Sequence, residues 1–327
     1  MKHISILVPK GAILGSIEGP RLVFAEVNAL LRRLGKPALF TIQLVGIEPA
    51  TPMCGGRYTV AADRLLPEVV RTDLVIIPAL DGDLPLALAQ NQDFLPWIVQ
   101  QYERGAEVAS LCVGAFLLAA TGLLAGRQCT THWAAAHDFR RMFPEVELVE
   151  DRLITDEHGI YSSGGAFSYL NLVLYLVEKF AGREMAVVCA KVFQIDMERV
   201  SQSAFVVFNG QKNHTDEPIK RAQTYIEENY QEKISVDQLA SMLALSRRNL
   251  ERRFKKATAN SVVEYMQRVK VEAAKTRLEA TAAHVNEVMY QVGYTDPKAF
   301  RLTFRRVTGL SPKQYRERYS RRGAAVG

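Results

Sequence analysis

Two segments near the C-terminal end follow the same pattern, and this pattern constrains the fold more than any other feature. The first runs from Ser235 to Lys256 and the second from His284 to Gly309. In each, a short amphipathic helix is followed by a tight turn and then by a helix whose polar face is rich in Arg and Lys. Such a pair of helices can present a cationic helix to the major groove of DNA. The sequence therefore predicts a module that binds DNA.

The distribution of charge supports this prediction. The 327-residue chain has a net charge of +6, and its length is sufficient for two domains. From Asp216 onward there are 22 basic and 13 acidic residues, whereas the preceding part has 19 basic and 22 acidic residues. Positive charge gathered in one region is typical of a module that contacts phosphates.

In the first unit, Ser246 occupies the position of a helix N-cap, so a recognition helix is expected from Arg247 to Lys256. Leu250 and Phe254 form an apolar i,i+4 pair that would anchor this helix to the core. Arginine forks fit guanine edges and asparagine fits adenine, although contacts with phosphates remain an open alternative for each side chain. The DNA-binding residues expected here are Arg247, Arg248, Asn249, Glu251, Arg252 and Lys255.

In the second unit, Gly293 allows the tight turn, and Phe300 and Phe304 would pack the following helix against the core. The DNA-binding residues expected here are Lys298, Arg301, Arg305 and Arg306. Between the units, residues 262–280 have good helix propensity throughout. A single long helix there would hold the two units at a fixed spacing.

The first part of the chain alternates short apolar β runs with helical patterns. Residues 3–10 read as a strand, residues 20–35 as an amphipathic helix and residues 38–47 as a second strand. This alternation predicts βαβ units and a mostly parallel sheet covered on both faces.

The chain is therefore expected to have three parts. Residues 1–182 would form an α/β domain, residues 183–216 a helical segment and linker, and residues 217–320 an all-α DNA-binding domain of two helix-turn-helix units. Within the middle part, a helical pattern extends from residue 183 to residue 208. A polar stretch from Asn209 to Pro218 follows it.

The cysteines indicate neither a disulfide framework nor a zinc site. They are widely scattered and include no CxxC pair: Cys54, Cys112, Cys129 and Cys189. The N-terminus lacks the features of a signal peptide, and the apolar runs are too short to span a bilayer. We expect a cytoplasmic protein without a membrane partner, metal or cofactor.

The C-terminal residues closely resemble the AraC-type (AraC/XylS) regulator domain from about Ile219 to Tyr319. The resemblance lies in the spacing of the two units, in the central helix EYMQRVKVEAAKTRLE and in the closing segment GYTDPKAFRLTFRRVTGLSPKQYRERY. It implies that each recognition helix enters one of two successive major-groove segments. One departure concerns the second helix, where the family usually reads F-[SAT]-R-x-F. Here the Arg is displaced by one position, to Arg301, which suggests a different contact with DNA.

The N-terminal residues resemble the class I glutamine amidotransferase-like superfamily, in particular the PfpI-like domains fused to AraC-type readers (the GlxA-like subgroup). Cys112 stands at the junction of an apolar strand and a helix, followed by a Thr-His-Trp segment ending at Trp133. The resemblance covers about Lys2 to Gly182. It implies a flavodoxin-like α/β sandwich with a mostly parallel sheet and the Cys112 side chain at the carboxyl edge.

Several departures from the enzymatic relatives argue against catalysis. Ser16 stands where those relatives carry an acid, Ala79-Leu80 replaces a Gly-Gly turn, and Val113 replaces a His. Asn171 also stands where the fused subgroup usually has Asp. A cysteine without base, acid or oxyanion pocket is a poor nucleophile, so Cys112 is interpreted as a vestigial nucleophile position and no catalytic residue is assigned.

A ligand pocket at the carboxyl edge of the sheet is nevertheless expected, because open parallel sheets bind ligands there. Its candidate residues are Glu18, Cys54, Leu80, Asp81, Cys112, Val113, His132 and Gly165. Two other interpretations stay open. The domain could be a Cys-dependent hydrolase or amidase tethered to DNA, or only a dimerisation platform.

Taken together, these patterns predict a transcriptional regulator that binds promoter or operator DNA. The first domain would be a non-catalytic sensor of a small-molecule effector and a dimerisation module that controls the DNA reader. A homodimer follows from the resemblance and would lengthen the DNA site. A contact with RNA polymerase is a further partner that this function implies.

Overall fold

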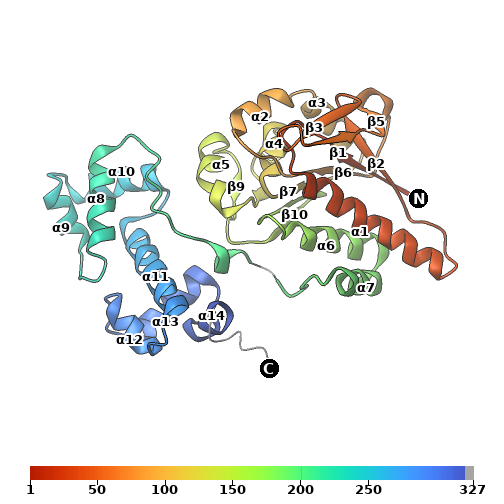
Figure 1. Ribbon diagram of the computed structural model, residues 1–327. Helices are drawn as coiled ribbons and strands as arrows, with labels where there is room; N and C mark the ends of the chain where they lie inside the picture. Colours follow the sequence, from red (N-terminus) through yellow and green to blue (C-terminus); the bar gives the residue numbers. More distant parts are fainter. Residues whose placement is uncertain (200, 321–327) are drawn as a thin grey trace. The chain divides into compact units, whose positions relative to one another are not determined.

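The computed structural model describes residues 1–199 and 201–320. The chain forms two compact units, Met1–Gln202 and the part from Ser203 onward (Figure 1). The junction falls within residues 183–216, the span that the sequence assigns to a helical segment and linker.

The first unit is built on a seven-stranded sheet of order β10-β11-β7-β6-β1-β2-β5. Neighbouring strands run parallel, except that β10 is antiparallel to β11. The strands are β1 (Lys2–Leu7), β2 (Phe40–Gly46), β5 (Arg64–Leu65), β6 (Leu74–Ile77), β7 (Glu107–Leu111), β10 (Ile154–Glu157) and β11 (Ile160–Ser163).

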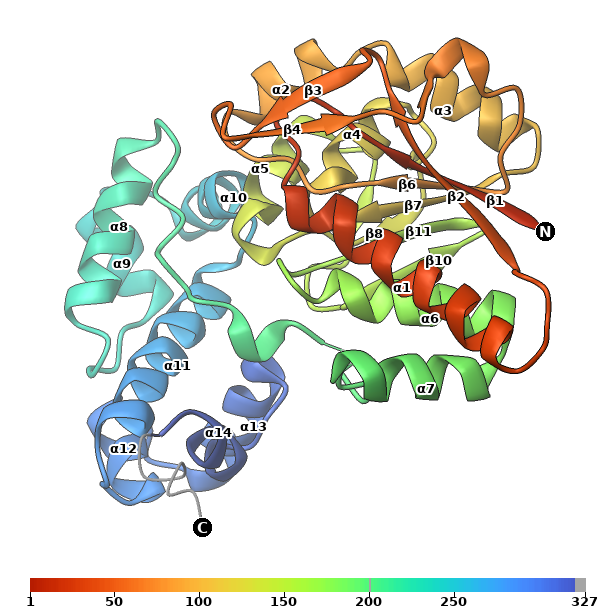
Figure 2. The same ribbon diagram turned by 45° about the vertical axis from the view of Figure 1, so that its right-hand side comes forward.

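Helices cover both faces of this sheet, as Figure 2 shows. Side chains alternate between the faces along each strand, so Ile4 and Ile6 enter one core whereas Leu7 enters the other. The first core contains residues of α1 (Leu14–Arg33), α6 (Tyr169–Ala181) and α7 (Arg183–Phe193). The second contains residues of α2 (Leu84–Gln90), α3 (Phe94–Glu103), α4 (Ala115–Ala120) and α5 (Ala136–Met142).

Short elements complete the first unit. Two small sheets pair β3 (Ala50–Met53) with β4 (Tyr58–Ala61), and β8 (Gln128–Cys129) with β9 (Glu147–Leu148). Three 3-10 turns are η1 (Leu66–Glu68), η2 (Cys112–Gly114) and η3 (Trp133–Ala135). Of these, η2 directly connects β7 to α4 and so shapes the carboxyl edge of the sheet.

The second unit is helical. It contains η4 (Ser203–Phe205), α8 (Glu217–Glu228), α9 (Val236–Met242), α10 (Arg247–Thr258), α11 (Val262–Ala280), α12 (Val285–Gln291), α13 (Pro297–Thr308) and α14 (Pro312–Tyr319). Ser or Asp side chains accept a backbone N–H bond at the start of most of these helices, including Ser246 before α10 and Asp296 before α13. These caps set where each helix begins.

Two separate cores divide this unit into two lobes. In the first lobe, Tyr265 of α11 packs with Leu250 and Phe254 of α10. In the second lobe, Phe300 and Phe304 of α13 pack with residues from the later part of α11 and from α12 and α14. Because α11 contributes to both cores, one continuous helix joins the lobes.

The fold class predicted from the sequence is confirmed: an α/β unit with a mostly parallel sheet and a helical unit with two helix-turn-helix lobes. Some boundaries differ. Helix α1 begins at Leu14, six residues before the predicted start, and includes Pro20. The helix predicted from residue 183 to residue 208 ends at Phe193, because Gln194 adopts a left-handed conformation with φ of 53°.

Candidate nucleic-acid interface and the turn at Cys112

The buried side of α10 is apolar and its opposite side is polar. Leu250 and Phe254 are fully buried, and the side chain of Thr258 closes the helix by donating to the Phe254 carbonyl at 2.8 Å. Of the DNA-binding residues predicted here, Asn249 is half-buried and the others are exposed: Arg247, Arg248, Glu251, Arg252 and Lys255. The helix therefore presents them away from its core.

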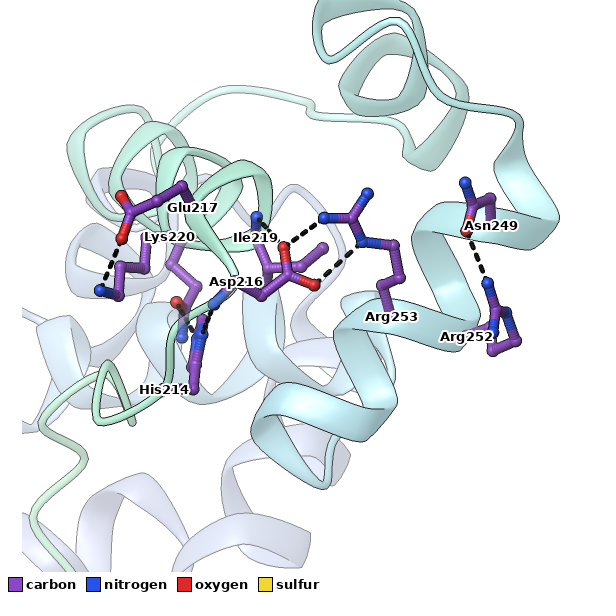
Figure 3. Close-up of polar contacts among 9 residues, drawn as sticks. His214, Asp216, Glu217, Ile219, Lys220, Asn249, Arg252 and Arg253 are labelled. Atoms are coloured by element: carbon purple, nitrogen blue, oxygen red, sulfur yellow. Dashed lines mark hydrogen bonds and ion pairs between the residues drawn. The ribbon is translucent and has the colours of Figure 1, made fainter.

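Several polar side chains of α10 are already paired with neighbours. Arg247 forms ion pairs with Asp237 at 3.2 Å and Glu251 at 3.1 Å. Nη2 of Arg252 donates to Oδ1 of Asn249 at 3.0 Å (Figure 3). The pairing orients these side chains before any DNA is bound.

Arg253 has a different role from its neighbours on α10. Its Nε and Nη2 donate to the two carboxylate oxygens of Asp216 at 2.9 and 2.6 Å (Figure 3). Asp216 is also the N-cap of α8 and accepts from the backbone N–H of Ile219. The guanidinium of Arg253 lowers the pKa of Asp216. Sequence analysis missed this pair, because the two residues are far apart in the chain and nothing local links them.

Helix α13 has the same buried pattern, with Phe300 and Phe304 at most 1% exposed. Its predicted DNA-binding residues are all exposed: Lys298, Arg301, Arg305 and Arg306. Arg306 donates to Oε1 of Gln267. Among the described residues, Lys298, Arg301 and Arg305 form no ion pair with a carboxylate. These three cations are therefore available to phosphates.

Lys270 of α11 connects the two lobes. Its ammonium donates to the Glu232 carbonyl of the first lobe at 3.3 Å and to the Gly293 carbonyl of the second at 3.1 Å. Gly293 has φ of 75°, and a Cβ at this position would overlap the Gln231 carbonyl. Backbone thus packs on backbone where the lobes meet. This contact restrains the spacing of the two recognition helices.

In the first unit, Cys112 is the first residue of η2 and forms the sharp turn directly after β7. Its φ is 55°, a conformation that is uncommon for residues other than glycine. The side chain is only 3% exposed, and burial raises the pKa of its thiol to about 11. The turn resembles that of an enzyme nucleophile, but its thiol remains protonated at neutral pH.

The groups around this turn are engaged in structural hydrogen bonds. The hydroxyl of Ser16 accepts from the backbone N–H of Ala79 at 2.9 Å and donates to the Ile13 carbonyl. The N–H of Ala79, the first residue of the turn that replaces Gly-Gly, therefore has a protein partner. Glu18 forms a bidentate ion pair with Arg21.

The structure places most of the predicted pocket residues at one edge of the sheet. Leu80 and Asp81 follow β6, Cys112 and Val113 follow β7, and Gly165 follows β11, and these three strands are neighbours. The hydroxyl of Thr131, next to His132, donates to the Cys112 carbonyl at 3.0 Å.

Of the other predicted pocket residues, Cys54 lies in a different turn and His132 is held by a local hydrogen bond. Cys54 is exposed in the turn between β3 and β4. The Nδ1 of His132 accepts from the backbone N–H of Ala134, and burial lowers the pKa of this imidazole. His132 therefore caps η3 as a neutral ring.

Gln202 is a buried residue that sequence analysis missed. Its Nε2 donates to the Thr131 carbonyl at 2.9 Å and to the Glu150 carbonyl at 2.8 Å. Because Thr131 also contacts Cys112, a short series of hydrogen bonds joins the Cys112 turn to the last residue of the first unit. A lone Gln in a polar segment carries no sequence signal for this role.

A cavity of about 260 Å³ lies away from the Cys112 turn. It is lined by residues of β10, α6 and the segment after α7, including Ile154, Asn171, Leu174 and Met197. The Asn171 amide donates to the Asp196 carbonyl at 2.5 Å. This residue, which replaces the usual Asp of the fused subgroup, thus holds the segment that follows α7.

Two family models match this chain, one in the α/β unit and one in the helical unit. Residues 239–318 match a helix-turn-helix domain, and residues 23–179 match the DJ-1/PfpI family. The chain joins a DJ-1/PfpI domain to an AraC-type helix-turn-helix domain. No helix of the described residues is long and apolar enough to cross a membrane.

The chain is similar to two transcriptional regulators and to one solved structure. HTH-type transcriptional regulator GbdR of Pseudomonas aeruginosa is 26% identical over 246 residues, which are 73% of this chain and 67% of that protein. HTH-type transcriptional regulator CdhR of the same organism is 24% identical over 294 residues, or 85% and 82% of the two chains. The structure of a ThiJ/PfpI family protein from Pseudomonas syringae has a TM-score of 0.50 at 17% identity, covering 74% of this chain and 90% of that one, and shows the same fold. The protein is a DNA-binding transcriptional regulator.

Proposed function

We propose that this regulator is sequence-specific and that its DJ-1/PfpI domain is a non-catalytic sensor of a small-molecule effector and a dimerisation module. The observation that carries the proposal is the surroundings of Cys112. Its thiol is buried with a raised pKa, and the Ala79 N–H beside the turn already bonds Ser16. A nucleophile needs a thiolate and an open oxyanion pocket, so this edge of the sheet favours binding over catalysis.

The same edge offers a route by which an effector would control the reader. A ligand seated among the loops after β6, β7 and β11 would press on the Cys112 turn. Thr131 bonds both this turn and Gln202, the last residue of the first unit. Displacement of Thr131 would therefore alter how the connection to the reader is held. We expect Gln202→Ala to bind both the effector and DNA. The effector should, however, change the affinity for DNA less in this variant than in the native chain.

The proposed sensor is tested by thermal unfolding of the full chain against a library of metabolites. A ligand that binds the folded state should raise the melting temperature. Val113→Trp adds bulk at the partly buried residue that follows Cys112 and should abolish the shift, whereas Val70→Trp at a 74% exposed position is the control for the added indole. If a ligand still stabilises Val113→Trp, the effector binds elsewhere, for example in the cavity beside Asn171.

The proposed reader and dimer are tested together by selecting and sequencing genomic fragments bound by the full-length protein at near-physiological salt. Two sequence elements about one helical turn apart would fit two recognition helices held by α11. A doubled arrangement of these elements, with a dimeric mass in analytical ultracentrifugation, would support the dimer. Binding without any sequence preference would contradict the proposed specificity.

A second candidate function is a Cys-dependent hydrolase or amidase. The observation that favours it is the left-handed backbone of Cys112 at the strand-to-helix turn, because this geometry exposes nucleophiles in related folds. Rapid stoichiometric alkylation of Cys112 at pH 7, with turnover that Cys112→Ser abolishes, would establish this alternative. Slow alkylation that accelerates only above pH 10 would exclude it.

A further inference from the structure

The two recognition helices are equivalent position by position. Leu250, Phe254 and Thr258 are buried in α10, and Phe300, Phe304 and Thr308 are buried in α13. A shift of 50 residues therefore superimposes one pattern on the other. The N-caps Ser246 and Asp296 follow the same shift. Any residue of α10 can thus be compared with its counterpart in α13.

This equivalence reveals a chemical difference at the centre of the outward face. With 3.6 residues per turn, the residue midway between two buried residues four apart points away from the core. In α10 this residue is Arg252, which bonds Asn249. In α13, Leu302 is the counterpart of Arg252, and Ala299 is the counterpart of Asn249. Both are exposed, with Leu302 at 62%. An apolar pair thus replaces a hydrogen-bonding pair.

The apolar pair lies among cations. Lys298, Arg301, Arg305 and Arg306 surround it on the exposed part of the same helix. Single exposed leucines are common on protein surfaces and by themselves indicate nothing. Leu302, however, is central to a face that would enter the major groove, with the long cationic side chains on its flanks. Residues at the centre of such a face meet base edges, whereas flanking cations reach the phosphates.

We infer that α13 reads thymine methyl groups through Leu302 and Ala299, whereas α10 reads hydrogen-bonding base edges through Asn249 and Arg252. This inference rests on the proposed sequence-specific function. The thymine C5-methyl is the apolar group that base pairs present in the major groove, and side chains such as Ala and Phe pack against it. The operator therefore has two chemically different elements.

The test replaces thymines of the selected operator one at a time by deoxyuridine, which removes only the methyl group. For the full-length protein, deoxyuridine at one or two positions should weaken binding about fourfold, the effect of losing one buried methyl group. Leu302→Ala should bind thymine and deoxyuridine equally well at one of these positions, the one that Leu302 reads. Because Leu302 is exposed, this variant keeps the core intact.

Two control variants separate methyl contact from other effects. Leu302→Met keeps an apolar side chain and should retain the preference for thymine. Met242→Ala removes an exposed apolar side chain from α9 and should leave the preference unchanged. The inference is overturned if no single deoxyuridine weakens binding, or if every deoxyuridine effect persists in Leu302→Ala, which indicates DNA shape. Failure of the selection to yield any sequence would instead overturn the proposed function and the inference with it.

Discussion

The two lobes of the reader have the same core pattern but different outward surfaces. In α10, Arg247 is paired with carboxylates, Arg252 with Asn249 and Arg253 with Asp216. In α13, the outward cations have no carboxylate partner among the described residues, and Leu302 stands at the centre of the face. The cores fix where each helix lies. The outward residues are free to diverge, so one fold provides two different readers.

Because the two cores are equivalent, the largest expected effect is a loss of stability when a buried Phe is removed from either lobe. Phe254 and Phe304 are fully buried in their lobes, so Phe254→Ala and Phe304→Ala should each lower the free energy of unfolding by about 3–5 kcal/mol. Urea unfolding of the full-length protein measures both. Leu302→Ala, at an exposed position, serves as the control and should change stability by less than about 0.5 kcal/mol. If either Phe→Ala variant changed the free energy of unfolding only slightly, the two lobes would not share the same packing.

The next largest expected effect is a loss of discrimination between base pairs when an outward arginine is removed. Arg252→Ala should reduce discrimination at one base pair by about 1–3 kcal/mol, because it removes a guanidinium that Asn249 already orients. Arg301→Ala on α13 should do the same if Arg301 contacts a base. Binding to a set of single-base operator variants measures both.

A phosphate contact would give a different result for either arginine. Binding would then weaken uniformly across all sequences, with a shallower dependence on salt. Lys313→Ala removes an exposed cation from α14 and is the charge-matched control. Uniform weakening by Arg252→Ala would contradict the view that α10 reads bases by hydrogen bonding.

The turns within the lobes differ as well. Gly293 has φ of 75° in the second lobe, whereas Ala244 has φ of 52° at the matching turn of the first. A left-handed conformation costs about 1–2 kcal/mol for a residue with a Cβ. Gly293→Ala should lower stability by about 2 kcal/mol or more, since its Cβ would also overlap the Gln231 carbonyl. Ala244→Gly should instead be neutral or slightly stabilising.

Both turn variants are measured by urea unfolding, and Gly293→Ala has a second readout. If Gly293 helps to fix the spacing of the lobes, the variant should lose more affinity for the complete operator than for either element alone. Equal losses on all three DNA fragments would limit the role of Gly293 to stability.

Sequence reasoning succeeded where the signal is local and failed where it is not. The side chain of Ser246 and the spacing of Leu250 and Phe254 suffice to place α10 and its outward face. The start of α1 escaped prediction, because Ile13 has no capping side chain and Pro20 suggests a later beginning. Which outward residues are already paired also escaped it. The partners of Arg253 and Gln202 come from distant parts of the chain, and only the folded structure brings them together.

The ion pair between Asp216 and Arg253 predicts the smallest effect, and it should be confined to the first lobe. Thr303, the counterpart of Arg253 in α13, carries no charge. Because the pKa of Asp216 is lower in the folded state, its charge stabilises the fold at neutral pH, and this contribution is lost as the pH falls below about 4.

Asp216→Asn tests this contribution, since asparagine is also a good N-cap and removes only the charge. The variant should lower the midpoint of thermal unfolding by about 2–4 °C at pH 7, and this difference from the native chain should shrink as the pH falls below about 4. Asp296→Asn, at the equivalent cap of α13, is the matched control and should change the midpoint less, because no arginine bonds its carboxylate in the described structure. Equal shifts for both variants would mean that the caps, rather than the ion pair, account for the effect, and that the two lobes respond to acid alike.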